Sequence, residues 1–357
     1  MSPIEFAIIG AGWRAAFYLR IAQALPERFR VAGMVVRNPD KAAAVEAAWG
    51  VPTYRDVEAL LAACRPQFAV TSVPWDANPS LLATLADRGM PVLSETPPAR
   101  DVDGLSEVWG LVERGARIQV AEQYIYQPHH AARLAFVASG ALGRVSQAQV
   151  SAAHGYHGTS LIRRFLGVGF EDVRITARTF NAPLVAGPDR SGPPQEERTV
   201  QSKQTIAWMD WGDRLGVFDF AGDQYFSWIR NERLLVRGER GEIINQQASY
   251  LADYRTPIEV AFRRQEAGPD GNLEGYYLKG IVAGERWVYR NPFVPARLAD
   301  DELAVASSLA GMAAYVAGGP EVYPLAEACQ DRYLDILIER AVTSGETVSS
   351  EAQVWAM

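Results

Sequence analysis

The sequence predicts an α/β protein in two parts: a parallel, doubly wound sheet over residues 1–123 and a second α/β domain over residues 124–357. Short apolar runs alternate with helical segments through the first part, and its first apolar run leads directly into a glycine turn. In the second part, several runs alternate apolar with polar residues, which is typical of a large, mostly antiparallel sheet with one open face. A chain of 357 residues is long enough to bury two cores.

The first part is expected to contain five strands and five helices. Runs such as Val31–Val36 lack polar alternation, so helices should cover both faces of their sheet, and a ligand should lie at the carboxyl ends of the strands. The strands are predicted at 4–9, 30–36, 68–73, 91–94 and 117–121, and the helices at 12–24, 39–48, 56–63, 78–88 and 101–114.

The second part should begin with a helix over 127–139 and end with two helices that pack between the domains. Residues Leu215–Phe220 alternate, which predicts a sheet face that a second copy of the chain covers in an isologous dimer. Residues 186–198 and 265–275 have the composition of surface loops. Strands are predicted at 145–154, 172–182, 201–210, 214–221, 224–230, 232–237 and 257–263, and the closing helices at 299–317 and 324–343.

Composition and charge exclude several classes of partner. The net charge of −7 leaves no basic surplus for nucleic acid, and no apolar stretch is long enough to span a bilayer. The first residues are predicted to form a strand, so no signal peptide is expected. Cys64 and Cys329 are far apart in predicted helices, which favours reduced thiols in a cytoplasmic protein.

The glycine turn Gly10-Ala11-Gly12-Trp13-Arg14-Ala15 follows the first strand and opens the first helix. Gly10 permits the tight turn, Gly12 leaves room for a pyrophosphate, and the helix N-terminus offers free N–H groups, so Trp13 and Arg14 should also border the cofactor. This spacing predicts a dinucleotide-binding Rossmann domain; the alternative is a glycine-rich turn in another α/β fold.

The end of the second strand indicates which dinucleotide is bound. Arg37 and Asn38 stand where an acidic residue would favour NAD, and Lys41 follows one turn later. A cation here can pair with a 2′-phosphate, so the sequence favours NADP over NAD, unless Arg37 is simply solvated.

Further cofactor contacts are expected where later strands end. Pro74 ends a strand at the cofactor edge, Trp75 is placed to pack on the cofactor, and Asn78 to hydrogen-bond to it. The alternative for Trp75 is packing in the core. Ser94-Glu95-Thr96-Pro97-Pro98 follows the next strand, and Glu95 is expected to border the same ligand.

These and other segments, in order, resemble the Gfo/Idh/MocA family of oxidoreductases (glucose–fructose oxidoreductase, inositol dehydrogenase and rhizopine catabolism proteins). The resemblance implies a Rossmann domain, a second domain whose sheet often forms a dimer interface, and NAD(P)-dependent hydride transfer. The matching segments are Ile8-Ile9-Gly10-Ala11-Gly12, Arg37-Asn38-Pro39-Asp40-Lys41-Ala42, Val73-Pro74, Glu95-Thr96-Pro97, Gln127-Pro128, Ser139-Gly140-Ala141-Leu142-Gly143-Arg144-Val145, His157 with Phe165-Leu166-Gly167, Arg237-Gly238-Glu239-Arg240-Gly241-Glu242 and Ser344-Gly345-Glu346-Thr347-Val348.

The chain departs from the family at its two signatures. Where the family has Glu-Lys-Pro, this chain has Thr96, whose hydroxyl cannot stabilise charge as an ammonium does. The second signature, Asp-x-Gly-x-His-x-x-Asp, keeps Gly155 and His157 but has Ala153 and Ser160 in place of both acids. The active site is therefore expected to be atypical.

His157 is the candidate general acid/base, with Thr96 and Tyr156 in support and His154 and Arg164 as substrate-binding residues. For a single histidine or arginine the alternative is a structural or solvated role, and His129 and His130 are expected to be structural or to line the cleft. His154 and His157 lack a third ligand nearby, so no metal is predicted.

Together these features predict an oxidoreductase that transfers hydride between the nicotinamide of NADP or NAD and a carbinol or carbonyl carbon of a sugar-like or polyol substrate. The alternative is a relative that binds the cofactor without dehydrogenase turnover, as a sensor or scaffold, or as a lyase- or glycosidase-type enzyme. The missing lysine and acids favour this alternative, and the intact glycine turn and His157 favour the oxidoreductase.

Overall fold

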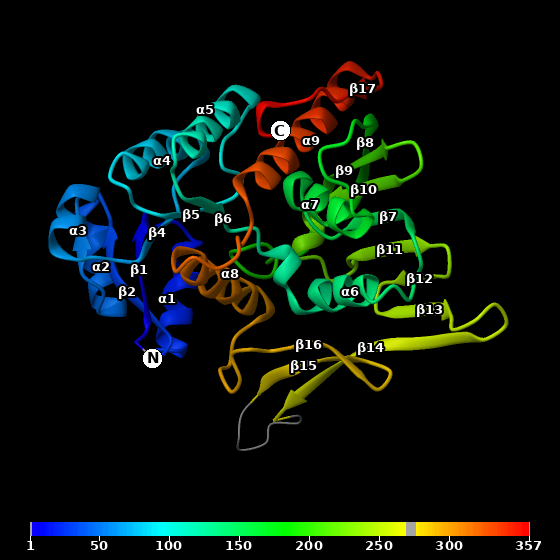
Figure 1. The fold of residues 1–357 in the computed structure, drawn as a ribbon, viewed down its shortest axis with the longest axis horizontal. Coiled ribbons are helices and arrows are strands. Elements are labelled where there is room, and N and C mark those ends of the chain that lie inside the picture. The colour runs from blue at the N-terminus through cyan, green and yellow to red at the C-terminus, as the bar shows by residue number, and fades with distance from the viewer. Residues whose placement is uncertain (1, 269–275, 357) are drawn as a thin grey trace.

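Two sheets organise the chain, with helices against both (Figure 1). The computed structural model describes residues 2–268 and 276–356. The first sheet has six parallel strands in the order β3-β2-β1-β4-β5-β6, and the second has eleven in the order β16-β15-β14-β13-β12-β11-β7-β10-β9-β8-β17. The predicted fold class, a parallel Rossmann sheet with a large, mostly antiparallel second sheet, is confirmed.

The first sheet and its helices follow the predicted order closely. The short β3, which pairs with the end of β2, was not predicted because two residues carry no periodicity. The elements are β1 (Ile4–Ile9), α1 (Ala15–Ala24), β2 (Phe29–Val35), α2 (Pro39–Trp49), β3 (Thr53–Tyr54), α3 (Val57–Ala63), β4 (Phe68–Thr71), α4 (Asn78–Ala86), β5 (Val92–Ser94), α5 (Val102–Glu113) and β6 (Ile118–Val120).

The second sheet pairs β10 with β7 in parallel, and its other described pairs are antiparallel. The hairpin strands β12, β13, β15 and β16 were not predicted. The elements are α6 (Pro128–Ala138), β7 (Val145–Ser151), α7 (Gly155–Leu166), β8 (Arg174–Val185), β9 (Thr199–Asp210), β10 (Leu215–Ala221), β11 (Arg233–Gly238), β12 (Gly241–Ile244), β13 (Gln247–Leu251), β14 (Pro257–Ala267), β15 (Tyr277–Ala283), β16 (Arg286–Arg290), α8 (Asp300–Val316), α9 (Leu325–Ser344) and β17 (Val348–Ser349).

Two strand predictions are wrong in part or in whole. Strand β7 ends at Ser151 rather than 154, because α7 begins at Gly155. Residues 224–230 form no strand: Gln224 caps the preceding turn by accepting from the N–H of Ala221 at 2.9 Å, and the Ser227 hydroxyl accepts from the N–H groups of Ile229 and Arg230. These local hydrogen bonds compete with a strand ladder. Of the loop predicted at 265–275, residues 265–267 belong to β14 and 269–275 lie outside the described residues.

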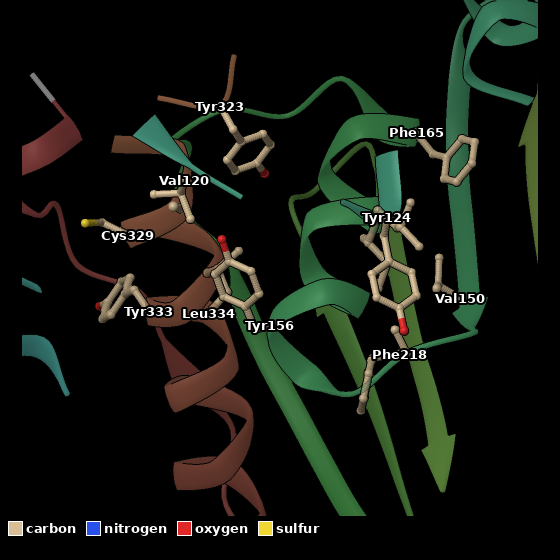
Figure 2. Packing of buried hydrophobic residues seen from close by; sticks show 14 of the residues in the cluster. Val120, Tyr124, Val150, Tyr156, Phe165, Phe218, Tyr323, Cys329, Tyr333 and Leu334 are labelled. Atoms are coloured by element: carbon tan, nitrogen blue, oxygen red, sulfur yellow. The ribbon is translucent and has the colours of Figure 1, made fainter. Parts of the chain in front are cut away.

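The largest core extends from the first sheet to the second, and α7 and α9 pack together within it (Figure 2). Phe218 of β10 lies under α7, and a Cβ added at Gly158 would approach its ring to 2.5 Å. The opposite face of the same sheet is more open, with Trp208 of β9 half-exposed opposite Val217.

The two closing helices join the sheets, as predicted. Helix α8 packs on α1 of the first unit, where Arg20 donates to Glu302 at 2.5 Å, while α9 contacts α5 and β6 on one side and α7 and β8 on the other. The arrangement places the N-terminus of α7 against the carboxyl ends of the first sheet (Figure 1). No described helix is long and apolar enough to cross a membrane.

Candidate active site

A cleft of about 960 Å³ runs along the carboxyl ends of β1, β2, β4 and β5. The glycine turn forms its floor, and His154 and His157 at the start of α7 line one end. Arg190, in the loop between β8 and β9, reaches the cleft from the second sheet, with its Cζ 4.2 Å from the ring centroid of Trp13. Both sheets therefore contribute to one site, at the position where doubly wound folds bind ligands.

The two glycines of the turn have different surroundings. Gly10 has φ +111°, and a Cβ there would lie 2.1 Å from the carbonyl oxygen of Ser72, so the fold itself requires glycine. A Cβ at Gly12 would make only ordinary contacts, with Ser72 at 3.7 Å. Protein packing does not explain Gly12, whereas the close approach of a pyrophosphate does.

Arg14 leaves the glycine turn and points to the interior of the site. Its Nε lies 3.8 Å from Oε2 of Glu95. Its Nη2 donates at 2.9 Å to the side-chain oxygen of Gln123, in the amide orientation that gives both the oxygen and the nitrogen of Gln123 a hydrogen-bond partner. Nη1 is buried and has no hydrogen-bond partner among the residues that the structure describes. A buried, unpaired guanidinium N–H beside the glycine turn fits an anionic or carbonyl group of a bound dinucleotide or substrate.

Three cations gather at the end of β2. Arg37, Lys41 and Arg55 line the cleft, and Arg55 donates to the carbonyl of Arg37 at 3.0 Å. Asn38 also lines it, but its side chain accepts from the N–H of Lys41 at 3.0 Å and caps α2. Asn38 therefore presents its backbone more than its amide to a ligand.

The ends of β4 and β5 contribute four of the predicted residues directly. Pro74, Trp75, Glu95 and Thr96 line the cleft, and Trp75 is 44% exposed, which is too open for a core residue. Asn78, in contrast, is buried: its amide donates to Ser94 at 3.0 Å and to the carbonyl of Pro98 at 2.8 Å. These bonds hold the segment that carries Glu95 and Thr96.

His157 is paired with a carboxyl group that the sequence did not indicate. Its Nδ1 lies 2.6 Å from Oε2 of Glu122, which follows β6, and the two residues are 4% and 0% exposed. Burial raises the pKa of Glu122 to about 8 and lowers the pKa of His157 to about 3. The pair is therefore electrically neutral near pH 7, with one proton shared between carboxyl and imidazole.

Other predicted site residues lie away from the cleft. Tyr156 is buried between α7 and α9 (Figure 2), and within the described part of the chain its hydroxyl has no hydrogen-bond partner. Arg164 lines a second hollow near the C-terminal end of α7, 3.6 Å from Glu327. His130 is buried, with Nδ1 3.3 Å from Arg133, so its role is structural, and neither it nor His129 is among the residues that line the cleft.

The site also contains Glu122, Gln123 and Arg190, which were not predicted from the sequence. The strand predicted at 117–121 corresponds to β6, so Glu122 could have been placed at the ligand edge of the sheet. Arg190 carried no such signal, because it lies in a loop of the second part. Among the described residues, no three histidine, cysteine or acidic side chains are grouped to hold a metal ion.

The parallel sheet, the glycine turn and the cleft at its carboxyl edge define a dinucleotide-binding protein of the Rossmann class. Residues 4–122 match the Gfo/Idh/MocA family, described as an oxidoreductase family with an NAD-binding Rossmann fold. This match confirms the resemblance over the N-terminal unit and supports, at the level of the family description, an NAD-binding oxidoreductase.

Solved structures share the fold over nearly the whole chain. A levoglucosan dehydrogenase in complex with NADH and levoglucosan is 15% identical, with a TM-score of 0.71 and coverage of 98% of this chain and 99% of that one. An Agrobacterium radiobacter oxidoreductase in complex with NAD⁺, L-tartaric acid and magnesium is 16% identical, with a TM-score of 0.67 and coverage of 97% and 98%. A putative myo-inositol dehydrogenase from Sinorhizobium meliloti is 16% identical, with a TM-score of 0.65 and coverage of 97% and 99%. No curated protein sequence shows a significant match to this chain.

Proposed function

We propose that the protein oxidises or reduces a sugar-like or polyol substrate at a carbinol or carbonyl carbon, using NADP or NAD. The observation that carries this proposal is the position of His157, which lines the same cleft as the glycine turn and Thr96. A proton-transferring group is thus held where the nicotinamide end of a dinucleotide is expected. Similar folds in proteins named for levoglucosan and myo-inositol support a polyhydroxylated substrate.

Each residue has a defined task in this proposal. The bound nicotinamide supplies or accepts the hydride. Gly10, Gly12 and Arg14 hold the dinucleotide, His157 moves the substrate hydroxyl proton, and Thr96 orients the substrate through its hydroxyl. Tyr156 packs edge-on at 5.1 Å from His157, so we assign it to holding the imidazole rather than to contact with substrate.

The cations at the end of β2 support NADP over NAD. Arg37 is exposed there and is joined at the rim by Lys41 and Arg55. A 2′-phosphate pairs with such a group by charge-assisted hydrogen bonds. Replacing Arg37 by Ala should weaken NADPH binding and leave NADH binding nearly unchanged.

Thr96 favours a second candidate function, a cofactor-binding protein without dehydrogenase turnover. A neutral hydroxyl stands where the family signature has an ammonium, so charge developing on the substrate oxygen must be met by another group. Arg14 lies beside Glu95 and lines the same cleft, and its Nη1 has no hydrogen-bond partner among the described residues, so it is a candidate for this group.

Cofactor titration followed by a substrate panel tests the proposal. NADPH and NADH are titrated against tryptophan fluorescence; sugars, inositols and hydroxy acids are then assayed at the nicotinamide absorbance band. We expect turnover that His157→Ala lowers by roughly 10²–10⁴-fold without a change in cofactor affinity, while His129→Ala retains activity. Tight cofactor binding with no turnover on the panel would establish the second candidate, and no binding at millimolar concentration would refute both.

We also propose an isologous dimer through the open face of the second sheet and a cytoplasmic location. The half-exposed Trp208 and Ile244 lie on that face, and Cys64 and Cys329 are free thiols, as in a reducing compartment. A monomer mass in light scattering at micromolar concentration would contradict the dimer.

A further inference from the structure

We infer that Glu122 is the proton partner of His157: the two side chains form a relay that carries the substrate proton away from the cleft. This inference rests on the proposed function, because it assigns the destination of the proton in that reaction. It replaces the acids that the family signature places near the histidine and that this chain lacks at Ala153 and Ser160.

The geometry fixes which atoms take part. Oε1 of Glu122 accepts from the backbone N–H of Tyr124 at 3.1 Å, so the carboxyl group is held from one side, and Oε2 faces Nδ1 of His157 at 2.6 Å. Neither side chain is open to bulk water except through the cleft that His157 lines. With Nδ1 engaged, Nε2 is the nitrogen left for a substrate.

The protonation state of Glu122 then determines whether Nε2 of His157 accepts or donates a proton. When the carboxyl group is ionised, Nδ1 donates to Oε2 and Nε2 is a bare acceptor, able to take a proton. When the carboxyl group is protonated, it donates to Nδ1 and Nε2 carries the hydrogen, able to give a proton. Glu122 therefore sets the imidazole tautomer and with it the direction in which the site works.

In the oxidation direction, each proton and the hydride have a defined destination. The substrate hydroxyl proton passes to Nε2, the proton on Nδ1 passes to Oε2 of Glu122, and the carbinol carbon becomes a carbonyl carbon as its hydride leaves to the oxidised nicotinamide. Imidazole ends neutral and the carboxylate ends as a carboxylic acid, so no charged imidazolium has to persist in a buried site. Reduction reverses every transfer.

The carboxyl group beside His157 comes from a different element than the one in which the family signature has its acids. Ser160 is committed elsewhere, 3.0 Å from the hydroxyl of Tyr323, and Ala153 has no functional group. Glu122 instead approaches His157 from the end of β6, in the parallel unit. The groups that act electrostatically on the pair from the surrounding elements are Arg14, Glu95, Tyr124, Tyr126, His154, Tyr156, Arg164, Tyr225, Asp301, Tyr323 and Asp331.

Replacing Glu122 by Gln is the direct test, because the amide keeps the size and a hydrogen bond but cannot exchange a proton. We expect kcat to fall by roughly 10²-fold or more with cofactor affinity and KM little changed, and the limb of the pH profile that reports Glu122 to disappear. Glu122→Asp should restore part of the activity and the pH limb. Glu302→Gln, another poorly exposed carboxyl-to-amide change on α8, is the matched control and should leave kcat and the pH profile unchanged.

A second readout does not depend on activity. The chain has four histidines, so nitrogen NMR of the imidazoles resolves His157 in the cofactor-free protein. We expect its two nitrogen shifts to exchange character as pH is raised through the titration of Glu122, and to stay constant with pH in Glu122→Gln. Unchanged nitrogen shifts in both proteins would overturn the relay. If the shifts respond but no substrate is turned over, the pair stands and the proposed function fails.

Discussion

Arg163 donates from Nη1 to Oδ1 of Asp331 at 2.6 Å, and both side chains are buried between α7 and α9. The same guanidinium donates to Glu327 at 2.8 Å and to the carbonyl of Gly169 at 2.9 Å. An arginine that sequence alone would allow to bind an anion is thus fully used inside the fold. It links α7, the helix that carries His157, to α9.

Replacing Arg163 should lower the free energy of unfolding substantially. In Arg163→Met the carboxylate of Asp331 stays buried without its cation, so we expect a loss of about 3–5 kcal/mol in the free energy of unfolding. Urea unfolding followed by circular dichroism measures it. Arg100→Met, which breaks the exposed pair with Asp76, is the control and should cost about 1 kcal/mol or less. An equal, small loss in both variants would contradict the structural role of Arg163.

The two glycines of the turn should respond in opposite ways. Gly10→Ala forces a Cβ against the Ser72 carbonyl in a left-handed backbone conformation, so we expect a clear fall in the melting temperature. Gly12→Ala has room in the protein and should melt near the wild-type temperature, but its methyl group should weaken NADPH and NADH binding. Calorimetry and fluorescence titration separate the two effects. Normal cofactor affinity in Gly12→Ala would place the dinucleotide elsewhere.

Arg190 should act on the cofactor from the second sheet. Its guanidinium lies over Trp13, beside the expected pyrophosphate position, so Arg190→Glu should raise the dissociation constant for NADPH about tenfold. Arg198→Glu makes the same charge change in the same loop, at a residue that does not line the cleft, and should have little effect. Equal effects of the two variants would mean that only net charge matters.

The stability of the protein should depend on pH through Glu122. Its pKa of about 8 in the folded state lies above that of about 4.3 in an unfolded chain, so its contribution is lost as pH rises through this range. The pKa of His157, lowered to about 3, acts in the opposite direction, and its contribution is lost as pH falls below about 6.5. Between pH 6.5 and 8 only the effect of Glu122 remains from this pair. Relative to Glu122→Gln, the wild-type free energy of unfolding should fall by about 1.4 kcal/mol per pH unit there; parallel curves would show that Glu122 is already ionised.

The alternation of strands and helices was predictable in the first unit because each strand is buried on both faces and reads as a continuous apolar run. The hairpin strands β12, β13, β15 and β16 were not, because β12, β13 and β16 are short and partly exposed and because the register of each strand depends on its neighbour. The glycine turn and His157 were found from local patterns. Glu122 was not, because its importance comes from a contact 35 residues away along the chain.

The residues of the site come from both units, and this limits which hybrid proteins can be active. With the boundary proposed at residue 123, Glu122 travels with the dinucleotide-binding half and His157 with the other. Consider a chimera that joins the second half of this chain to the first half of a relative with the usual lysine. It would gain the ammonium group, but His157 would lose its carboxyl partner unless that relative also carries an acid at the position of Glu122. The reverse chimera would bring Glu122 to a histidine that already has its own acids. Working hybrids should therefore require that residues 96, 122 and 157 be exchanged as a set.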